Sequence, residues 1–334
     1  MIQGGFHAVF PMGDSSRVGE ARRHAAQLAV DCGLDEVEAG RLAIIVTELA
    51  TNLLRHAKQG QLWLSAQPGR REVEVIAVDH GPGMPDVARS LDDGFSTVGT
   101  PGTGLGAIRR LAQHFDLVSH VPDGSIVLAR VRAAGVADAA GACCMGAVSF
   151  TAPGEQVCGD GWRFAMEGER TALMLADGLG HGPEAAEAAQ AALAAFADDP
   201  MESPRLLLER THRALRGTRG AALMVLQADA HAGTIRSAGA GNVMARLVSG
   251  TTDRTLLCQH GTAGVTIRSP EEITTPWPPH AMLVVFSDGI ESRWKPESLV
   301  SVLKRDPALA AAVLARDHCR GRDDATVAVL RRKD

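Results

Sequence analysis

The sequence predicts an α+β protein built from two domains, for three reasons. The chain has 334 residues, about twice the length of an ordinary domain. Its first half opens with two segments of helical periodicity, 15–31 and 36–57, whereas its second half is dominated by short apolar runs typical of strands. A patternless stretch of small residues, 134–142, lies between them. We therefore expect a first domain at 1–133, a linker at 134–142 and a second domain at 143–334, although the linker would also suit a short Ala-rich helix.

The elements of the first half follow from its apolar spacing. In the second helical segment, apolar residues repeat at intervals of three and four, at Val37, Leu42, Ile45, Val46, Leu49 and Leu53. Strands are expected at 61–66, 72–79, 116–121 and 124–131. A third helix should begin near Gly104 and run through Ile108, Leu111 and Phe115. Helices that cover one face of a mostly antiparallel sheet would give an α+β sandwich.

The second half combines many strands with helical pairs. Strands are expected at 145–151, 161–166, 171–177, 221–228, 233–238, 243–248, 282–287 and 325–330. Helices are expected at 183–197, 203–216, 296–305 and 307–316. So many strands with two helical pairs indicate two sheets covered by helices.

Composition excludes several classes of protein. Hydrophobic residues make up 45% and charged residues 22%, as in ordinary globular proteins, and the formal net charge of −5 gives no general attraction for nucleic acid. No apolar run approaches the roughly 20 residues of a membrane span, and the N-terminus lacks the pattern of a secretory signal. The six cysteines are scattered without zinc spacing. We expect a cytoplasmic protein that binds neither nucleic acid nor membrane.

Three motifs in the first half suggest a site for a phosphorylated ligand. Glu48, Asn52 and His56 share one stripe of a helix, although a polar stripe can simply face solvent. The run Asp79-His-Gly81-Pro-Gly83 follows an apolar strand, where glycines let a ligand approach the backbone, or merely form a turn. The run Gly102-Thr103-Gly104-Leu105-Gly106 opens a helix and would expose N–H groups to an anion.

The order of these motifs resembles the boxes of the GHKL superfamily of ATPases and kinases, and especially anti-sigma-factor serine/threonine kinases of the RsbT type (HATPase_c). The likeness covers about residues 8–132 and implies a Bergerat-type α/β sandwich that binds ATP. It implies that Asn52 binds Mg²⁺, that Asp79 accepts a hydrogen bond from adenine, and that Glu48 is the general base. The glycines of the other two motifs would line the base pocket and the phosphates, with Thr103 and Leu105 beside them: Gly81, Gly83, Gly102, Gly104 and Gly106.

Acidic residues stand at strand ends in the second half. Asp160, Asp177, Asp288 and Asp323 each lie beside glycines or at the edge of an apolar run, a pattern that on its own often marks a turn. Carboxylates that converge at one edge of packed sheets would repel one another without a cation. Oxygen-rich sites suit hard divalent cations, so we expect Asp177 to bridge two metal ions and Gly178 to offer its carbonyl.

The series CGDGW, ADGLGHG, SAGAGN, FSDGI and GRDDATVAVL resembles the PP2C superfamily, in its SpoIIE-type branch and most nearly the RsbX type. This likeness covers about residues 143–331 and implies an α-β-β-α sandwich with protein phosphatase activity. It implies that Asp160, Asp177, Gly178, Asp288 and Asp323 hold two Mn²⁺ or Mg²⁺ ions, with Asp177 central to catalysis. The roles of Asp324 and His181 stay open, and no arginine matches the phosphate-binding arginine of eukaryotic relatives.

Together, these resemblances imply a bifunctional bacterial switch enzyme, with a kinase that uses Mg-ATP followed by a metal-dependent phosphatase. The expected substrates are STAS-domain proteins, namely an anti-sigma-factor antagonist or a stressosome scaffold. Two alternatives stay open. The first half could act by binding a sigma factor or a downstream phosphatase, with ATP as a structural ligand, or one half could be degenerate, although every box is intact.

Overall fold

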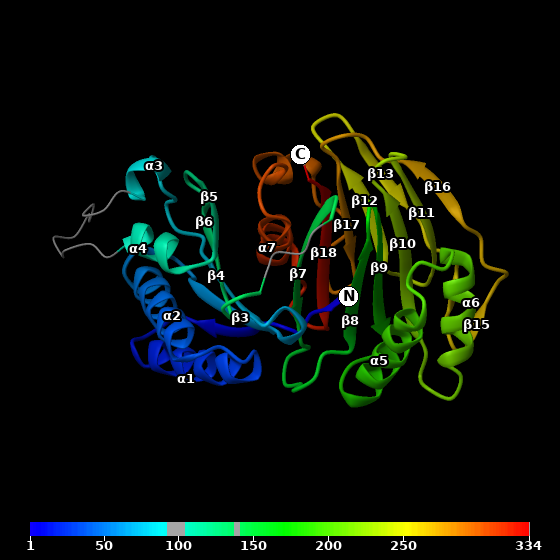
Figure 1. The fold of residues 1–334 in the computed structure, drawn as a ribbon, viewed down its shortest axis with the longest axis horizontal. Coiled ribbons are helices and arrows are strands. Elements are labelled where there is room, and N and C mark those ends of the chain that lie inside the picture. Colours follow the sequence, from blue (N-terminus) through cyan, green and yellow to red (C-terminus); the bar gives the residue numbers. More distant parts are fainter. Residues whose placement is uncertain (92–103, 137–140, 334) are drawn as a thin grey trace. The chain divides into compact units, whose positions relative to one another are not determined.

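The computed structural model describes residues 1–91, 104–136 and 141–333, and the chain divides into two units (Figure 1). The N-terminal unit is His7–Asp138, and the C-terminal unit combines Met1–Phe6 with Ala139–Asp334. The N-terminal unit therefore begins six residues later and ends five residues later than the expected first domain, 1–133. None of the helices within the described ranges is long and apolar enough to cross a membrane.

The N-terminal unit is a five-stranded antiparallel sheet with helices on one face. Its strands are β2 (Ala8–Pro11), β3 (Gln61–Gln67), β4 (Glu72–Val78), β5 (His114–His120) and β6 (Gly124–Arg132), in the order β2-β3-β4-β6-β5. Its helical segments are α1 (Ser16–Asp31), α2 (Glu36–His56), the short α3 (Val87–Ser90), α4 (Gly104–Leu111) and the 3₁₀ turn Pro68–Arg70. The expectation that the third helix extends to Phe115 was wrong, because α4 ends at Leu111 and Phe115 belongs to β5. Figure 1 shows α1 and α2 side by side across one face of this sheet.

Helix α2 is well defined by its sequence. The Asp35 side chain accepts hydrogen bonds from the backbone N–H groups of Val37 and Glu38, and the Glu38 carboxylate accepts one from the Asp35 N–H, which completes a capping box. The apolar stripe of α2 then packs on alternate residues of β3 and β4. This core includes Leu42, Ile45, Val46, Leu49, Leu53, Leu62, Leu64, Val73, Val75 and Ala77. The periodic apolar residues of α2 thus form the contacts that hold this helix on the sheet.

The other face of this sheet carries buried ion pairs. Glu74 of β4 accepts a hydrogen bond from Arg130 Nε of β6 at 2.6 Å, and His7 Nε2 lies 3.1 Å from its other oxygen. Glu72 is paired in the same way with Arg132 Nε at 2.7 Å. Burial alone would raise the pKa of Glu74, but Arg130 and His7 outweigh it and hold the pKa below its usual range.

The C-terminal unit is built on two antiparallel sheets. The first has the order β1 (Ile2–Gln3), β8 (Asp160–Glu167), β9 (Arg170–Gly178), β10 (Ala221–Asp229), β11 (Thr234–Ala240) and β16 (Ile273–Pro276). The second has the order β13 (Asp253–Leu256), β12 (Met244–Val248), β17 (Met282–Phe286), β18 (Ala325–Arg332) and β7 (Cys143–Phe150). A separate hairpin joins β14 (Gly261–Thr262) to β15 (Thr266–Ile267).

Helices cover both outer faces of this pair of sheets. Helices α5 (Pro183–Asp198) and α6 (Pro204–Ala214) lie against the first sheet, and α7 (Pro307–His318) lies against β7 and β18 of the second. The expected helix at 296–305 is instead a 3₁₀ helix over Pro296–Val302, so that prediction was wrong in type. The expected α-β-β-α order of layers is present.

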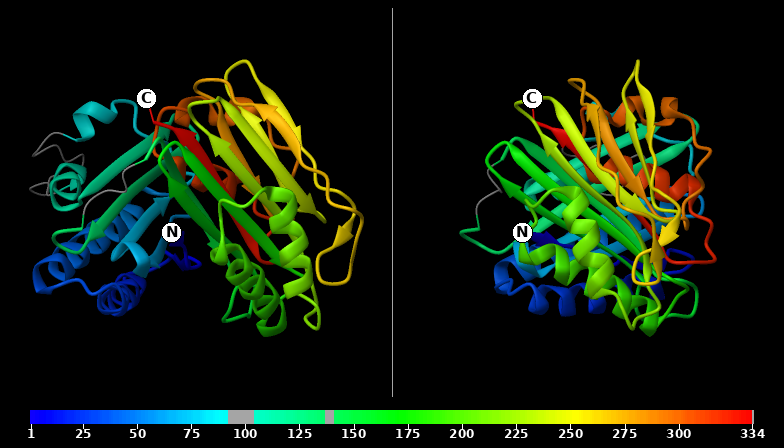
Figure 2. Two further views of the ribbon diagram at one scale, coloured as in Figure 1. Left: turned by 45° about the vertical axis from the view of Figure 1, so that its right-hand side comes forward. Right: turned by 90° about the vertical axis from the view of Figure 1, so that its right-hand side faces the viewer.

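Alternation along the strands builds the core between the two sheets, which Figure 2 shows stacked face to face. The first sheet contributes Trp162, Phe164, Leu173, Leu175, Met224 and Leu226. The second contributes Ala147, Leu247, Leu283, Val285, Ala328 and Leu330. Because side chains alternate between faces, every second residue of β8 and β9 points into this core.

The first residues of the chain form an edge strand of the C-terminal unit. Ile2 pairs with Phe164 and Gln3 with Arg163, in antiparallel register along β8. The Gln3 side chain also accepts a hydrogen bond from Arg163. Gly4 lies directly against the Trp162 ring, and a side chain at this position would overlap that ring. The segment Met1–Phe6 therefore covers Trp162 and closes one edge of the sheet.

Candidate active sites

Two acidic residues face each other at one end of the first sheet. Asp160 begins β8, Asp177 is the penultimate residue of β9, and the two are direct partners in the antiparallel ladder. Asp177 shares the inward face of β9 with Leu173 and Leu175, both of which belong to the core between the sheets. Both carboxylates are therefore directed toward the second sheet.

The second sheet brings three more carboxylates to the same region. Asp288 lies two residues beyond the end of β17, and Asp323 and Asp324 immediately precede β18. Strands β17 and β18 are neighbours, and the backbone N–H of Ser287 donates to the carbonyl of Thr326 at 3.0 Å. The sequence-predicted acids thus occupy one end of both sheets.

Protein donors hold three of these carboxylates in place. Ser287 Oγ donates to Asp160 Oδ2 at 2.6 Å, which joins the two sheets at the site. Asn242 Nδ2 donates to Asp288 Oδ2 at 2.5 Å, and the backbone N–H of Ala152 donates to Asp324 Oδ1 at 2.9 Å. Ser287 was missed at the sequence level, although it directly precedes the predicted Asp288. Asn242 belongs to the SAGAGN motif, but the sequence does not indicate its contact with Asp288.

The carboxyl groups interact electrostatically. Burial, followed by the charges of Asp160, Asp288, Asp323 and Asp324, raises the pKa of Asp177 to about 9. Burial also raises the pKa of Asp160 to about 7, against the opposing hydrogen bonds from Ser287 and Thr326. These carboxyl groups repel one another when they are ionised. A bound cation would stabilise their ionised forms.

Unsatisfied oxygens give a direct test of whether divalent cations fit this site. Asp160 Oδ1 and Asp324 Oδ2 are buried and have no hydrogen-bond partner. Buried polar atoms of this kind are rare, and an ion is one of the few groups that can satisfy them. Across the described ranges, no three His, Cys, Asp or Glu side chains already stand at metal-binding geometry. All the candidate ligand atoms are oxygens, which suits Mg²⁺ or Mn²⁺. Three of the carboxylates, however, accept hydrogen bonds from protein groups.

Glycines allow helix α5 to lie close to the acidic residues. A Cβ at Gly178 would overlap the carbonyl oxygen of Ala185, in the first turn of α5. A Cβ at Gly159 would come within 2.8 Å of the Ala185 side chain. Packing against α5 therefore requires glycine at position 178. The sequence had suggested only that the Gly178 carbonyl could be a metal ligand. Gly180 and Gly182 adopt positive φ angles of 83° and 80°, which favour glycine.

Polar side chains pair with one another along the loop that follows Asp177. His181 Nδ1 lies 2.7 Å from Glu155 Oε1, and Arg219 forms an ion pair with Glu184. These pairs are partly exposed at the surface. Through these pairs, one nitrogen of each of His181 and Arg219 contacts a glutamate of the same surface.

The nucleotide motifs of the N-terminal unit fall on the expected elements. Glu48 and Asn52 are half-buried on α2, one turn apart, and His56 is exposed at the end of the helix. Helix α2 contacts α4, which begins at Gly104 and includes Leu105 and the buried Gly106. Gly102 and Thr103 lie outside the described residues.

The loop after β4 is held by its own hydrogen bonds. Asp79 Oδ1 accepts from the N–H of Gly81 at 2.5 Å, and the N–H of His80 donates to the carbonyl of Lys58, just beyond α2. Gly83 has φ of 72°, and a Cβ there would overlap the carbonyl of His120. The structure thus brings Asp79 and Gly81 beside the end of α2, and Gly83 beside His120 at the end of β5. No ligand contact is needed to explain these two glycines.

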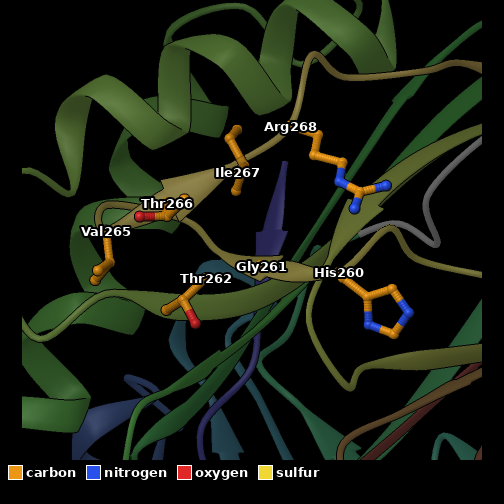
Figure 3. A pocket seen from close by; sticks show the side chains of 7 residues that line it. All are labelled: His260, Gly261, Thr262, Val265, Thr266, Ile267 and Arg268. Carbon is orange, nitrogen blue, oxygen red and sulfur yellow. The ribbon is translucent and has the colours of Figure 1, made fainter.

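A pocket of about 290 Å³ lies elsewhere, on the β14–β15 hairpin (Figure 3). Its lining includes His260, Thr262, Val265, Ile267 and Arg268. None of the predicted site residues lines it. It contains no carboxylate, so it is not the site of the divalent-cation chemistry considered above.

Fold and site together define a class of protein. A kinase-like ATPase domain, formed by the helix-covered sheet, is followed by a phosphatase domain of the PP2C type, formed by the two stacked sheets. Residues 13–131 match the histidine kinase-like ATPase domain family, and residues 167–333 match the Stage II sporulation protein E (SpoIIE) family. The chain belongs to the SpoIIE family through its C-terminal unit, and its N-terminal unit is a histidine kinase-like ATPase domain.

Similar proteins support both assignments. The serine/threonine-protein kinase RsbT of Bacillus subtilis (strain 168) is 35% identical over 111 residues, which are 33% of this chain and 84% of RsbT. A chain from a structure of the bacterial stressosome, a modular system adapted to control secondary messenger signaling, is 27% identical. It covers 57% of this chain and 99% of its own length, with a TM-score of 0.54. RsbX in complex with magnesium has a TM-score of 0.52 at 19% identity, over 57% of this chain and 96% of RsbX, which shows a shared fold.

Proposed function

We propose that this chain is a bifunctional switch regulator that adds phosphate to a protein serine or threonine and removes it again. The substrate we propose is a STAS-domain protein, either an anti-sigma-factor antagonist or a stressosome scaffold. The likeness to RsbT and to a stressosome structure supports this choice. The two opposed activities would consume ATP without net effect, so we propose that partner binding favours one of them at a time.

The phosphatase assignment depends most on one observation. Carboxylates from two different sheets converge, and two of their buried oxygens, on Asp160 and Asp324, lack any partner. We propose that Asp160, Asp177, Asp288, Asp323 and the Gly178 carbonyl hold two Mg²⁺ or Mn²⁺ ions. When bound, such ions neutralise phosphoryl charge and acidify a water molecule. All four other aspartates raise the pKa of Asp177, so its charge interacts with each of theirs.

Neighbouring residues hold the aspartate side chains in position. Ser287 links β8 to the second sheet through Asp160, and Asn242 orients Asp288. Gly178 and Gly159 admit α5 to the back of the site. The chain itself therefore positions the carboxylates and excludes water behind them.

For the kinase half, we propose that Asp79 binds the adenine amino group and Asn52 the Mg²⁺ of ATP. Gly81 and Gly83 would line the base, and Gly102, Thr103, Gly104, Leu105 and Gly106 the phosphates. Glu48 would accept the proton of the attacking hydroxyl, because it lies one turn of α2 from Asn52 and so near the γ-phosphate. Phosphoryl transfer needs mainly positioning and charge neutralisation, which these groups would supply.

The decisive experiment follows the phosphorylation of a STAS-domain protein incubated with the full chain, ATP and Mg²⁺ or Mn²⁺. The wild type should first add phosphate and, after ATP is removed, release it. Glu48→Gln should lose phosphorylation while still binding ATP, and Asp177→Ala should lose only the release. If Glu48→Gln phosphorylates normally, the N-terminal half acts by binding rather than catalysis. A substrate whose phosphate never changes under any metal condition contradicts the proposal.

A further inference from the structure

The acidic site is lined by carboxylates, which would repel a negatively charged substrate. Five carboxylates surround it, and the nearby Arg219 is paired with Glu184. A phosphoryl group carries about two negative charges near neutral pH. A site of this kind therefore needs positive groups at its rim in addition to ions between its acids.

Two loops that carry acidic residues run side by side at this rim. Ile290 and Cys319 form an antiparallel bridge, and the N–H of Arg320 donates to the carbonyl of Gly289 at 2.9 Å. Gly289 lies so close to Asp324 that a Cβ would overlap the Asp324 carbonyl. These contacts place Arg320 beside the Asp288–Gly289 turn, and Arg322 directly before Asp323.

Both arginine side chains are exposed and free. Among the described residues, no hydrogen-bond or ion-pair partner is found for the guanidinium of Arg320 or Arg322. Arg316, nearby in α7, is paired with Asp317 at 2.7 Å. Partial desolvation and Asp323 raise the pKa of Asp288, whereas Arg320 and Arg322 lower it, so both guanidinium groups act on this carboxylate without an ion pair.

We propose that Arg320 and Arg322 bind the phosphoryl group of the substrate at the rim of the acidic site. This inference rests on the proposed phosphatase function and assigns the phosphate recognition that the sequence comparison leaves open. A guanidinium donates two parallel hydrogen bonds to a phosphate, and its charge does not change over the working pH range. The ligand is the phosphate itself, not acidic residues that flank it in a protein substrate.

The test compares the wild type with Arg320→Ala, Arg322→Ala and the double variant, using p-nitrophenyl phosphate, a phosphorylated STAS-domain protein and inorganic phosphate. Loss of a charged hydrogen-bonding pair should raise KM for both substrates, and the Kd of inorganic phosphate measured by calorimetry with Mn²⁺, about tenfold. The value of kcat should change less than KM. Arg322→Lys should restore part of the affinity, because the charge returns without the paired donors.

Two controls separate this inference from others. Arg254→Ala removes an exposed arginine from the edge strand β13 and should leave all values unchanged. Mn²⁺ affinity, measured without phosphate, should not fall in any arginine variant, because each substitution removes a positive charge that acts on Asp288. Unchanged phosphate affinity in the double variant overturns the inference, as does an effect confined to the phosphoprotein. If no chain hydrolyses either substrate but phosphate binding still depends on the arginines, the proposed phosphatase activity fails and this inference stands.

Discussion

Asp160 and Asp177 lie directly opposite each other on neighbouring antiparallel strands, and both are directed into the space between two sheets. Like charges directly opposite on paired strands destabilise a sheet. Here the cost is larger because burial raises the pKa of both carboxyl groups. The pair therefore weakens the fold and is expected to be retained for the ligand that it holds.

Replacing one member of this pair should separate stability from activity. In the presence of a chelator, Asp177→Asn should raise the unfolding temperature by roughly 2–4 °C, because it removes a charge that the folded state disfavours. The same variant should lose metal-dependent hydrolysis of p-nitrophenyl phosphate. Calorimetric unfolding with and without Mn²⁺ measures both effects, since the wild type should gain stability from the ion and the variant should gain less. A variant that is less stable than the wild type in chelator would contradict this view of the site.

The close approach of α5 to β9 can be tested at Gly178. Gly178→Ala should lower the free energy of unfolding by about 1–3 kcal/mol, because its Cβ would overlap the backbone of Ala185. Phosphatase activity should fall with it, as α5 moves away from the acids. Gly250→Ala is the matched control, because a Cβ there meets no atom within 4 Å. Urea unfolding of both variants gives the comparison, and equal stabilities would contradict the proposed packing.

In the N-terminal unit, Gly83 offers the corresponding test of the nucleotide site. Gly83→Ala should weaken ATP binding at least about tenfold, since the positive φ alone costs roughly 1–2 kcal/mol and the Cβ would push His120 away. Gly69→Ala, on the same unit but with open space around it, should bind ATP as the wild type does. Fluorescence titration with a labelled ATP analogue distinguishes them. Normal affinity in Gly83→Ala would show that this loop does not shape the site.

Substitution in a buried ion pair of the N-terminal sheet should strongly destabilise the N-terminal unit. Glu74→Gln should cost about 3–5 kcal/mol, because it removes the carboxylate 2.6 Å from buried Arg130 and leaves the more distant Glu72, at 3.8 Å, as a charge partner. Glu20→Gln removes an exposed ion pair with Arg17 and should cost no more than about 0.5 kcal/mol. Hydrogen exchange at β4 and β6 reports the loss within this unit. Comparable protection in the two variants would contradict a stabilising role.

The same pair gives the N-terminal unit a pH dependence of known sign. The pKa of Glu74 is lower in the folded state than in the unfolded state, so its contribution is present above the ordinary glutamate range. That contribution should be lost as the pH falls below about 4.3 toward the lowered value. Hydrogen exchange at β4, followed across this acid range, should therefore show less pH dependence in Glu74→Gln than in the wild type.

Elements with long, regular patterns were predictable from the sequence. The apolar spacing of three and four residues predicted α2, and apolar runs predicted β4, β9 and β17. These predictions succeeded because the same apolar residues form the core contacts of each element. The short strands β1 and β16 were not predicted, since two to four residues carry no period. The segment 296–302 has helical composition, but it winds as a 3₁₀ helix.

The candidate site was predictable in its residue types and not in its contacts. Aspartates at the ends of apolar runs indicated which residues would meet, because strand ends share a sheet edge. The bonds of Asp160 with Ser287 and of Asp288 with Asn242 join segments far apart in the chain, and no local pattern predicts them. Whether Arg320 and Arg322 form ion pairs likewise depends on which nearby carboxylates are already bonded to other residues, and no local pattern shows this.

Residues 1–6 give the chain an unexpected path. It starts in the phosphatase unit, leaves to build the whole ATPase unit, and then returns to complete the first fold. The ATPase unit is thus an insertion, attached through both of its ends. A fragment cut at residue 143 would lack an edge strand and would leave the Trp162 ring without the Gly4 backbone against it. A single break in the chain therefore could not separate the two units without damage to the first sheet of the C-terminal unit.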